Sequence, residues 1–305
     1  MKKIFISLLA VVALAACNKS EVVDVNPGEA IQFGNAFVDN ATKADYSSTD
    51  INSFKVYGTV NDVNIYNATP VTKSAEYGDA WKCDLTQYWI KDAAYKFAAL
   101  VDVPDTNVTT DTKGMPVSFT YTADNQTDIL YDYALATGNE AGKNSIVAFT
   151  FQHLLAKAYF TVTNLTNDTK YTYTVSTVNV TNTYPNGTYT VYTTDGGTGS
   201  WGSFGTATST AFATIENVAF ETPKTNAELL LIPGATVGVS FTVTLSIDGK
   251  VVTSFDHSLE NVATLAQNSV YNFNVTLSPN DPILFTVTTQ PEWNEVSDNT
   301  VTVSK

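Results

Sequence analysis

The chain contains no arginine, and all sixteen of its basic residues are lysines. Arginine is the usual bidentate partner of phosphate and carboxylate groups, so its absence argues against that mode of recognition. Thirty acidic residues give a formal net charge of -14. Because nucleic-acid binding needs basic patches, this charge balance excludes nucleic acid as an expected partner.

Cysteine is also scarce, with only Cys17 and Cys83 in the chain. If Cys17 is modified, Cys83 has no disulfide partner, and the folded protein depends on packing for its stability. We interpret Cys83 as a small buried residue. The alternative interpretation is a reactive thiol.

Long apolar runs are absent after residue 17, and the one before it is short. Lys2 and Lys3 precede an apolar stretch at residues 4–16, which Cys17 follows. This stretch is shorter than the roughly 20 residues of a spanning helix, and its pattern is typical of an export signal. Cys17 after Leu-Ala-Ala resembles the lipobox of bacterial lipoproteins, which implies acylation of Cys17 and removal of residues 1–16. The alternative is an ordinary signal peptide.

Strand signals dominate the rest of the chain. Residues 239–247 alternate strictly, which places Val239, Phe241, Val243, Leu245 and Ile247 on one buried face. Similar signals occur at residues 54–60, 117–121, 171–180, 271–277, 284–288 and 300–303. These one-sided strands predict an all-β protein of antiparallel β-sandwiches.

Turn-forming and flexible residues refine this prediction. Asp248-Gly249 and Asn186-Gly187 each predict a two-residue hairpin turn, and one short helix is possible within residues 84–99. The small and polar stretch at residues 137–144 predicts a domain boundary. The expected organisation is a signal peptide at 1–16, a tether at 17–43, and β-sandwich domains at 44–143 and 144–305.

No set of residues predicts catalysis, and we expect neither an enzyme nor a metal or cofactor site. The only two histidines are 104 positions apart and lack metal-ligand neighbours. We interpret His153 as a hydrogen-bonded structural residue. Asp256, His257 and Ser258 are adjacent in sequence, whereas the members of a triad converge in space.

Several weak motifs occur in a fixed order along the chain. They lie at residues 31–33, 41–44, 95–99, 128–131, 147–164, 231–234, 283–287 and 291–293. In this order, after a lipobox, they resemble the fimbrillin family, the lipoprotein-derived pilins of type V pili. The likeness covers nearly the whole chain.

The resemblance implies two transthyretin-like β-sandwich domains in tandem and export as an outer-membrane lipoprotein. It also implies cleavage by a protease in the loop after the first strand. Lys43 occupies that segment where well-known members have arginine, so the expected cut lies between Lys43 and Ala44. This substitution leaves the identity of the protease open.

A physical mechanism accompanies the resemblance. Ile31 and Phe33 would leave with the cleaved first strand, and the resulting apolar groove would accept a strand from a neighbouring subunit. We expect the donor to be the last strand, with Val301 and Val303 inserted. The preceding strand, with Phe285 and Val287, is the second contributor.

The sequence therefore leads to two hypotheses for the function. The first is a structural fimbrial subunit that supports adhesion, with other pilin subunits of the same or another kind as partners. The alternative is a monomeric outer-membrane lipoprotein that binds glycans or host ligands. Only the first requires a cleavable N-terminal segment.

A Lys43→Ala change should trap a lipidated, unassembled precursor, because the protease loses its cleavage residue. The measurement is the mass of the protein extracted from membranes and from sheared surface material. Normal release of residues 18–43 from this variant would contradict the cleavage site.

Overall fold

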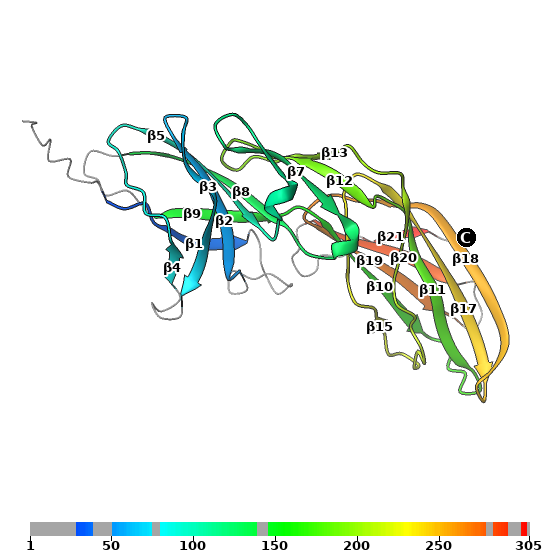
Figure 1. The fold of residues 1–305 in the computed structure, drawn as a ribbon. Coiled ribbons are helices and arrows are strands. Elements are labelled where there is room, and N and C mark those ends of the chain that lie inside the picture. The colour runs from blue at the N-terminus through cyan, green and yellow to red at the C-terminus, as the bar shows by residue number, and fades with distance from the viewer. Residues whose placement is uncertain are drawn as a thin grey trace, which may run out of the picture.

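The protein is all-β in the computed structural model, which describes residues 29–38, 51–74, 80–138, 146–278, 283–291 and 300–303. Figure 1 shows an elongated molecule whose strands form two halves, one around β2, β5 and β9 and the other around β10, β11 and β17. In the described residues, helical structure is confined to the 3-10 turns η2 (Asp105–Asn107) and η3 (Ala123–Asn125).

A seven-stranded sheet and a four-stranded sheet build the first half. The seven-stranded sheet has the order β1 (Phe33–Val38), β9 (Val147–His153), β8 (Leu130–Thr137), β5 (Ala94–Val101), β2 (Ser53–Val60), β3 (Val63–Ser74) and β4 (Ala80–Cys83). The four-stranded sheet has the order β13 (Ser200–Gly202), β12 (Asn186–Thr190), β7 (Pro116–Thr122) and β6 (Val108–Thr110).

Two sheets also build the second half. One contains β15 (Lys224–Thr225), β10 (Ala156–Asn164), β19 (Ser269–Leu277), β20 (Leu284–Pro291) and β21 (Thr300–Val303), and β16 (Leu229–Leu231) also pairs with β10. The other contains β14 (Thr208–Ala211), β11 (Thr172–Thr183), β17 (Thr236–Ile247) and β18 (Lys250–Thr264). Apolar residues of both sheets meet in one core, for example Phe160 and Phe241, whose ring centroids are 5.6 Å apart.

The seven-stranded sheet is buried on both faces. Tyr95, Phe97 and Ala99 of β5 point into one core, and Ala98 and Leu100 of the same strand point into the other. The second core lies against the four-stranded sheet. The first is enclosed by the sheet itself, which curls until its edge strands β1 and β4 meet.

Most strand predictions are confirmed, including the long alternating one. Val239, Phe241 and Val243 of β17 are buried, while Leu245 and Ile247 are half-buried near the end of the strand. The turn between β17 and β18 is the expected one, since Asp248 and Gly249 have φ angles of 48° and 73°.

Two local predictions are wrong. Residues 84–99 contain no helix, and β5 begins at Ala94. This strand is buried on both faces and therefore reads as a continuous apolar run that hides its period of two. Asn186 and Gly187 form no hairpin turn but begin β12, which pairs with β7 in a different sheet from β11.

The pairing also differs from a purely antiparallel arrangement. β1 pairs with β9 and β10 pairs with β19 in parallel, and the remaining pairs between named strands are antiparallel. In addition, the sheets cross the division expected at residue 143, because β9, β12 and β13 complete the sheets of the first half. These pairings join segments far apart in sequence, which local patterns do not specify.

The environment of Cys83 tests its interpretation as a small buried residue. Cys83 is half-buried and has a free thiol near the carbonyl oxygen of Leu85 (Sγ–O 3.4 Å), and burial raises the pKa of this thiol. It fits a packing role better than a reactive one.

Across the part of the chain described by the structure, no helix has the length and apolar character needed to cross a membrane.

Asp132 of β8 carries a buried carboxyl group in the first half. Its oxygens accept hydrogen bonds from the Thr150 N–H (2.7 Å) and the Tyr192 hydroxyl (3.2 Å). Burial nevertheless raises the pKa of Asp132 from 3.8 to about 6. The folded state therefore binds a proton at Asp132 more tightly than the unfolded state does. The resulting contribution to the free energy of unfolding is full below pH 3.8 and is lost as the pH rises through about 6.

An Asp132→Asn variant should lose part of this pH dependence, because an amide has no charge to desolvate. We expect the wild-type free energy of unfolding to fall by about 2–3 kcal/mol more than that of the variant between pH 4 and pH 7. Urea unfolding at both pH values measures this difference. Asp62→Asn is the control, since Lys113 and Lys96 lower the pKa of exposed Asp62 to about 2. An equal pH dependence in the wild type and in Asp132→Asn would contradict the raised pKa of Asp132 in the folded state.

Candidate functional site

The N-terminal strand segment lies between two walls of backbone. At its start, the Ile31 N–H donates to the Gln87 carbonyl oxygen (2.8 Å), and the Trp89 N–H donates to the Glu29 carbonyl oxygen (3.0 Å). Ala30 and Tyr88 form an antiparallel bridge between these bonds. Residues 87–89 are therefore the first wall of a slot that residues 29–38 fill.

The second wall is β9. β1 runs parallel to it from the Phe33–Val147 pair to the Val38–Phe151 pair, and the Val147 N–H donates to the Gln32 carbonyl oxygen (2.8 Å). Gly34 lies close to this wall, because a Cβ atom there would be 2.8 Å from Cγ2 of Ile146. The segment thus has backbone partners on one side at its start and on the other side along its length.

Two side chains of this segment, those of Ile31 and Phe33, lie in the core enclosed by the curled sheet. Ile31 is 5% exposed and Phe33 is 4% exposed. The Phe33 ring lies among four other aromatic rings at centroid distances of 5.4 to 6.4 Å, those of Phe54, Tyr66, Phe97 and Phe149. Such contacts add to the free energy of area burial, so Phe33 is the main anchor of the segment.

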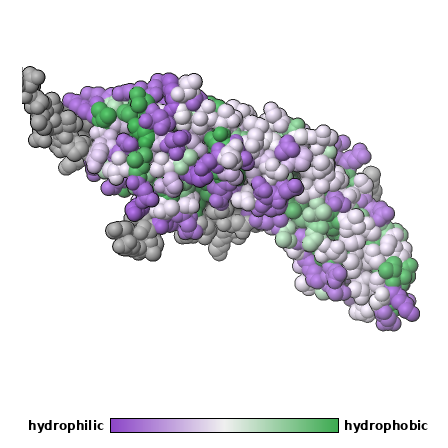
Figure 2. Space-filling view, in the orientation of Figure 1, coloured by the Kyte–Doolittle hydropathy of each residue, from purple (hydrophilic) through white to green (hydrophobic). Residues whose placement is uncertain are grey.

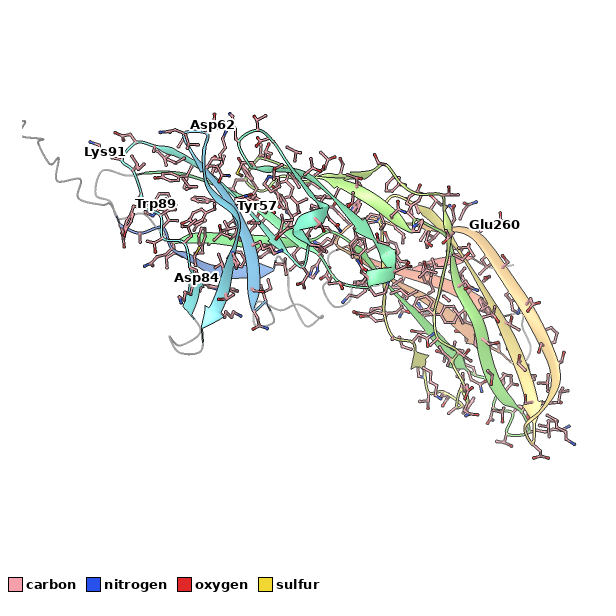
Figure 3. The ribbon with its side chains drawn as sticks, in the orientation of Figure 1. Tyr57, Asp62, Asp84, Trp89, Lys91 and Glu260 are labelled. Atoms are coloured by element: carbon pink, nitrogen blue, oxygen red, sulfur yellow. The ribbon has the colours of Figure 1, made fainter. Side chains whose placement is uncertain are left out.

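The first wall does not depend on the N-terminal segment for its position. The Tyr95 hydroxyl donates to the Tyr88 carbonyl oxygen (3.1 Å) and accepts from the Ile90 N–H (2.6 Å). Trp89 is buried against Tyr95, with ring centroids 4.6 Å apart, in the half of the molecule that holds β1 (Figure 3). The slot therefore has one wall that the rest of the core holds in place.

The C-terminal strand has a different environment. β21 is the last strand of its sheet and pairs antiparallel with β20, with Val301 opposite Val287 and Val303 opposite Phe285. Phe285 and Val287 of β20 are buried in the core of the second half, 2% and 1% exposed. β20 is an integral core strand, whereas β21 is an edge strand.

The predicted site residues divide into three groups. Ile31 and Phe33 lie together in the slot. Val301 and Val303 belong to β21, which lies in the other half of the molecule (Figure 1). Cys17, Lys43 and Ala44 lie outside the described residues. Residues 87–89 were not predicted, because the sequence Gln-Tyr-Trp has no alternation of apolar and polar residues that would mark a strand.

The two histidines considered for catalysis make structural contacts. His153 is confirmed as a hydrogen-bonded buried residue, with Nδ1 2.6 Å from Oδ2 of Asp128, whose pKa burial raises. His257 stacks on Phe241, with ring centroids 5.1 Å apart. Over the ranges that the structure describes, no three His, Cys, Asp or Glu residues cluster as a metal site would require.

The sequence matches a known protein family over most of its length. A family model described as fimbrillin-like matches residues 36–293. The chain belongs to the fimbrillin-like family. Residues 1–18 match a prokaryotic membrane lipoprotein lipid attachment site, which confirms the predicted lipoprotein signal. This fimbrillin-like chain is therefore an exported surface lipoprotein of fimbriae and a structural or adhesion protein, not an enzyme.

Solved structures agree on the fold. A fimbrial protein from Bacteroides vulgatus is similar over 87% of this chain and 99% of its own, with 13% identity and a TM-score of 0.58. A candidate cell adhesion protein from Bacteroides uniformis is similar over 87% and 98%, with 17% identity and a TM-score of 0.51. No curated protein matches the fimbrillin-like chain.

A Phe33→Ala change in the uncleaved protein should lower the free energy of unfolding by about 3–5 kcal/mol, because it empties the aromatic cluster. Urea unfolding followed by tryptophan fluorescence measures this loss. Val63→Ala is the control, since Val63 is 64% exposed and its loss should cost about 0.5 kcal/mol or less. Equal stability of the two variants would show that the N-terminal segment does not fill the slot in solution.

Proposed function

We propose that this fimbrillin-like chain is a structural subunit of a bacterial cell-surface fimbria that supports adhesion. A protease cuts after Lys43, the N-terminal strand leaves its slot, and the C-terminal strand of a neighbouring subunit takes its place. The observation that carries this proposal is the burial of Ile31 and Phe33 in a slot with backbone partners on both sides. The segment that contains Lys43 follows β1 directly in the sequence.

The energetics support replacement over a permanently empty slot. Burying each of Ile31 and Phe33 contributes roughly 1.5–3 kcal/mol. Loss of the strand also leaves backbone groups of β9 and of residues 87–89 without partners, and each such group costs roughly 1–3 kcal/mol if it stays buried. An opened slot is therefore a strong template for another strand.

The C-terminal strand is the best donor in the described chain. Val301 and Val303 have the same i, i+2 spacing as Ile31 and Phe33, so both pairs can point to one face of a strand. β21 pairs over only four positions with β20, whereas β20 pairs over eight with β19. Detaching β21 therefore costs less than detaching β20, which would also empty the sites of Phe285 and Val287.

The geometry favours an open polymer. β1, whose place is the slot, lies in the first half and β21 in the second (Figure 1), so the two surfaces of one subunit differ. Contacts between unlike surfaces run head to tail and build a filament unless their rotation closes a ring. Partners of the same or another subunit type would fit this scheme.

The remaining parts of the proposal concern organisation and export. We assign two β-sandwich domains of transthyretin-like topology, with β9, β12 and β13 in the first domain in place of a boundary at residue 143. Lipid on Cys17 holds the precursor in the outer membrane until cleavage. A static surface lipoprotein that binds glycans or host ligands would need neither the cut nor the exchange.

A Val301→Asp/Val303→Asp variant should abolish fibre assembly, because two carboxylates cannot enter the aromatic slot without a large desolvation cost. Thr300→Asp/Thr302→Asp is the matched control, since it adds the same charge to the opposite face of the strand and should retain assembly. Electron microscopy and ladder patterns of sheared surface material measure fibre length and yield.

The thermal unfolding of both precursors shows whether the second half stays folded. Fibres of normal length and yield from the valine variant, or from a chain lacking residues 299–305, would show that the tail is not the donor.

A further inference from the structure

A polar pocket lies at one end of the sheet formed by β14, β11, β17 and β18. Its volume is about 440 Å³, and residues from all four strands line it. Figure 3 labels Glu260 on β18 at this pocket, and Figure 2 shows that hydrophilic and neutral residues cover much of the visible face of the molecule. The proposed exchange of strands uses no residue of this pocket.

Two irregularities of the sheet create the pocket. The register shifts between Thr181 and Thr183 where β11 pairs with β14, and between Val237 and Val239 where β17 pairs with β18. Such bulges bend a strand and re-aim its side chains.

Each shift contains an asparagine with a left-handed backbone. The φ angles are 62° for Asn182 and 55° for Asn261. The Asn182 side-chain amide donates to the Thr236 carbonyl oxygen (2.6 Å), which holds the rim of the pocket in place.

The floor of the pocket is backbone. Gly238 is buried, and a Cβ atom at this position would lie 2.5 Å from the carbonyl oxygen of Leu259 and 2.6 Å from Oγ1 of Thr181. Only glycine fits between these groups. Without the glycine, β17 could not approach β11 and β18 closely enough to leave the hollow above it.

The lining defines the chemistry of a ligand. Glu260 is its one charged side chain, and the other polar groups are amides and hydroxyls, including those of Asn182, Asn261, Thr208 and Ser209. Among the residues that the structure describes, no lysine, histidine or aromatic residue lines the pocket. Anions therefore find no counter-charge, and large apolar groups find no apolar wall.

We propose that this pocket binds a neutral sugar residue. Adjacent sugar hydroxyls can donate to the Glu260 carboxylate, and the remaining ones can pair with the amides and the Thr and Ser hydroxyls, which serve as donors and acceptors. Six of the nine lining residues are exposed, among them Glu260 and Asn261, so a bound sugar stays partly in solvent. Because no aromatic ring stacks on the ligand, we expect a dissociation constant on the order of 1 mM.

Weak binding suits a repeated subunit. If the proposed fimbrial function holds, each subunit of a fibre presents one copy of the pocket, and multivalent contact with a glycan-covered surface multiplies the affinity. The pocket itself belongs to a single subunit and does not require polymerisation, so the two proposals can fail separately.

The test uses the full mature chain from residue 17 with Cys17→Ser, produced without its signal peptide so that it carries no lipid. Methyl glycosides of glucose, galactose, mannose and N-acetylglucosamine are titrated at millimolar concentrations and followed by saturation-transfer difference NMR. Glu260→Gln removes the charge, and Asn261→Gly removes the amide while glycine retains the positive φ. Glu216→Gln is the matched control, since Glu216 is exposed and does not line the pocket.

The expected result is saturable binding of at least one glycoside, weakened at least tenfold in both pocket variants and unchanged in the control. Absence of saturable binding by all four glycosides would overturn the proposal, as would binding by both pocket variants that equals binding by the wild type. Binding that requires Ca²⁺ and disappears with a chelator would overturn direct recognition by Glu260. Each of these results leaves the fibre-assembly test unaffected.

Discussion

The insertion of Phe33 among four aromatic rings is the contact on which the first half of the molecule depends. The seven-stranded sheet curls around this side chain, and its two edge strands meet there. A sheet of this curvature has an inner face that no second sheet covers. β1 is the edge strand that closes the curl against β4, and Ile31 and Phe33 of the N-terminal segment lie in the inner core, so removing the segment opens that core as well as the edge of the sheet.

The two ends of the chain are held in different ways. Residues 29–38 are fixed by buried side chains and by backbone partners on both walls, whereas β21 has a partner strand on one side within the described chain. This asymmetry suits a subunit that gives up one strand only after a covalent cut and offers the other more readily. Membership of the fimbrillin-like family and the lipoprotein attachment site show an exported surface lipoprotein of fimbriae, which is where the proposed exchange would take place.

Sequence patterns predicted the elements whose signal is local. β17 alternates because one of its faces is buried, and Asp248-Gly249 marks its turn because both residues accept a positive φ angle. β5 was missed because burial on both faces removes the alternation. The parallel pairing of β1 with β9 joins residues more than 100 positions apart, and no local pattern encodes that choice of partner.

The candidate site was predicted to a similar extent. The apolar spacing of Ile31 and Phe33 identified the strand that fills the slot. It could not identify the wall at residues 87–89, which the Tyr95 hydroxyl and the packing of Trp89 hold in place. The pocket around Gly238 also escaped prediction, because it arises from two register shifts that exist only after the strands pair.

The N-terminal residue of the protein in sheared surface fibres tests the central claim most directly. Mass spectrometry of that material should find a chain that begins at Ala44 and lacks Ile31 and Phe33. A chain that still begins at a lipidated Cys17 would show that the N-terminal strand stays in its slot, and would contradict assembly by strand exchange.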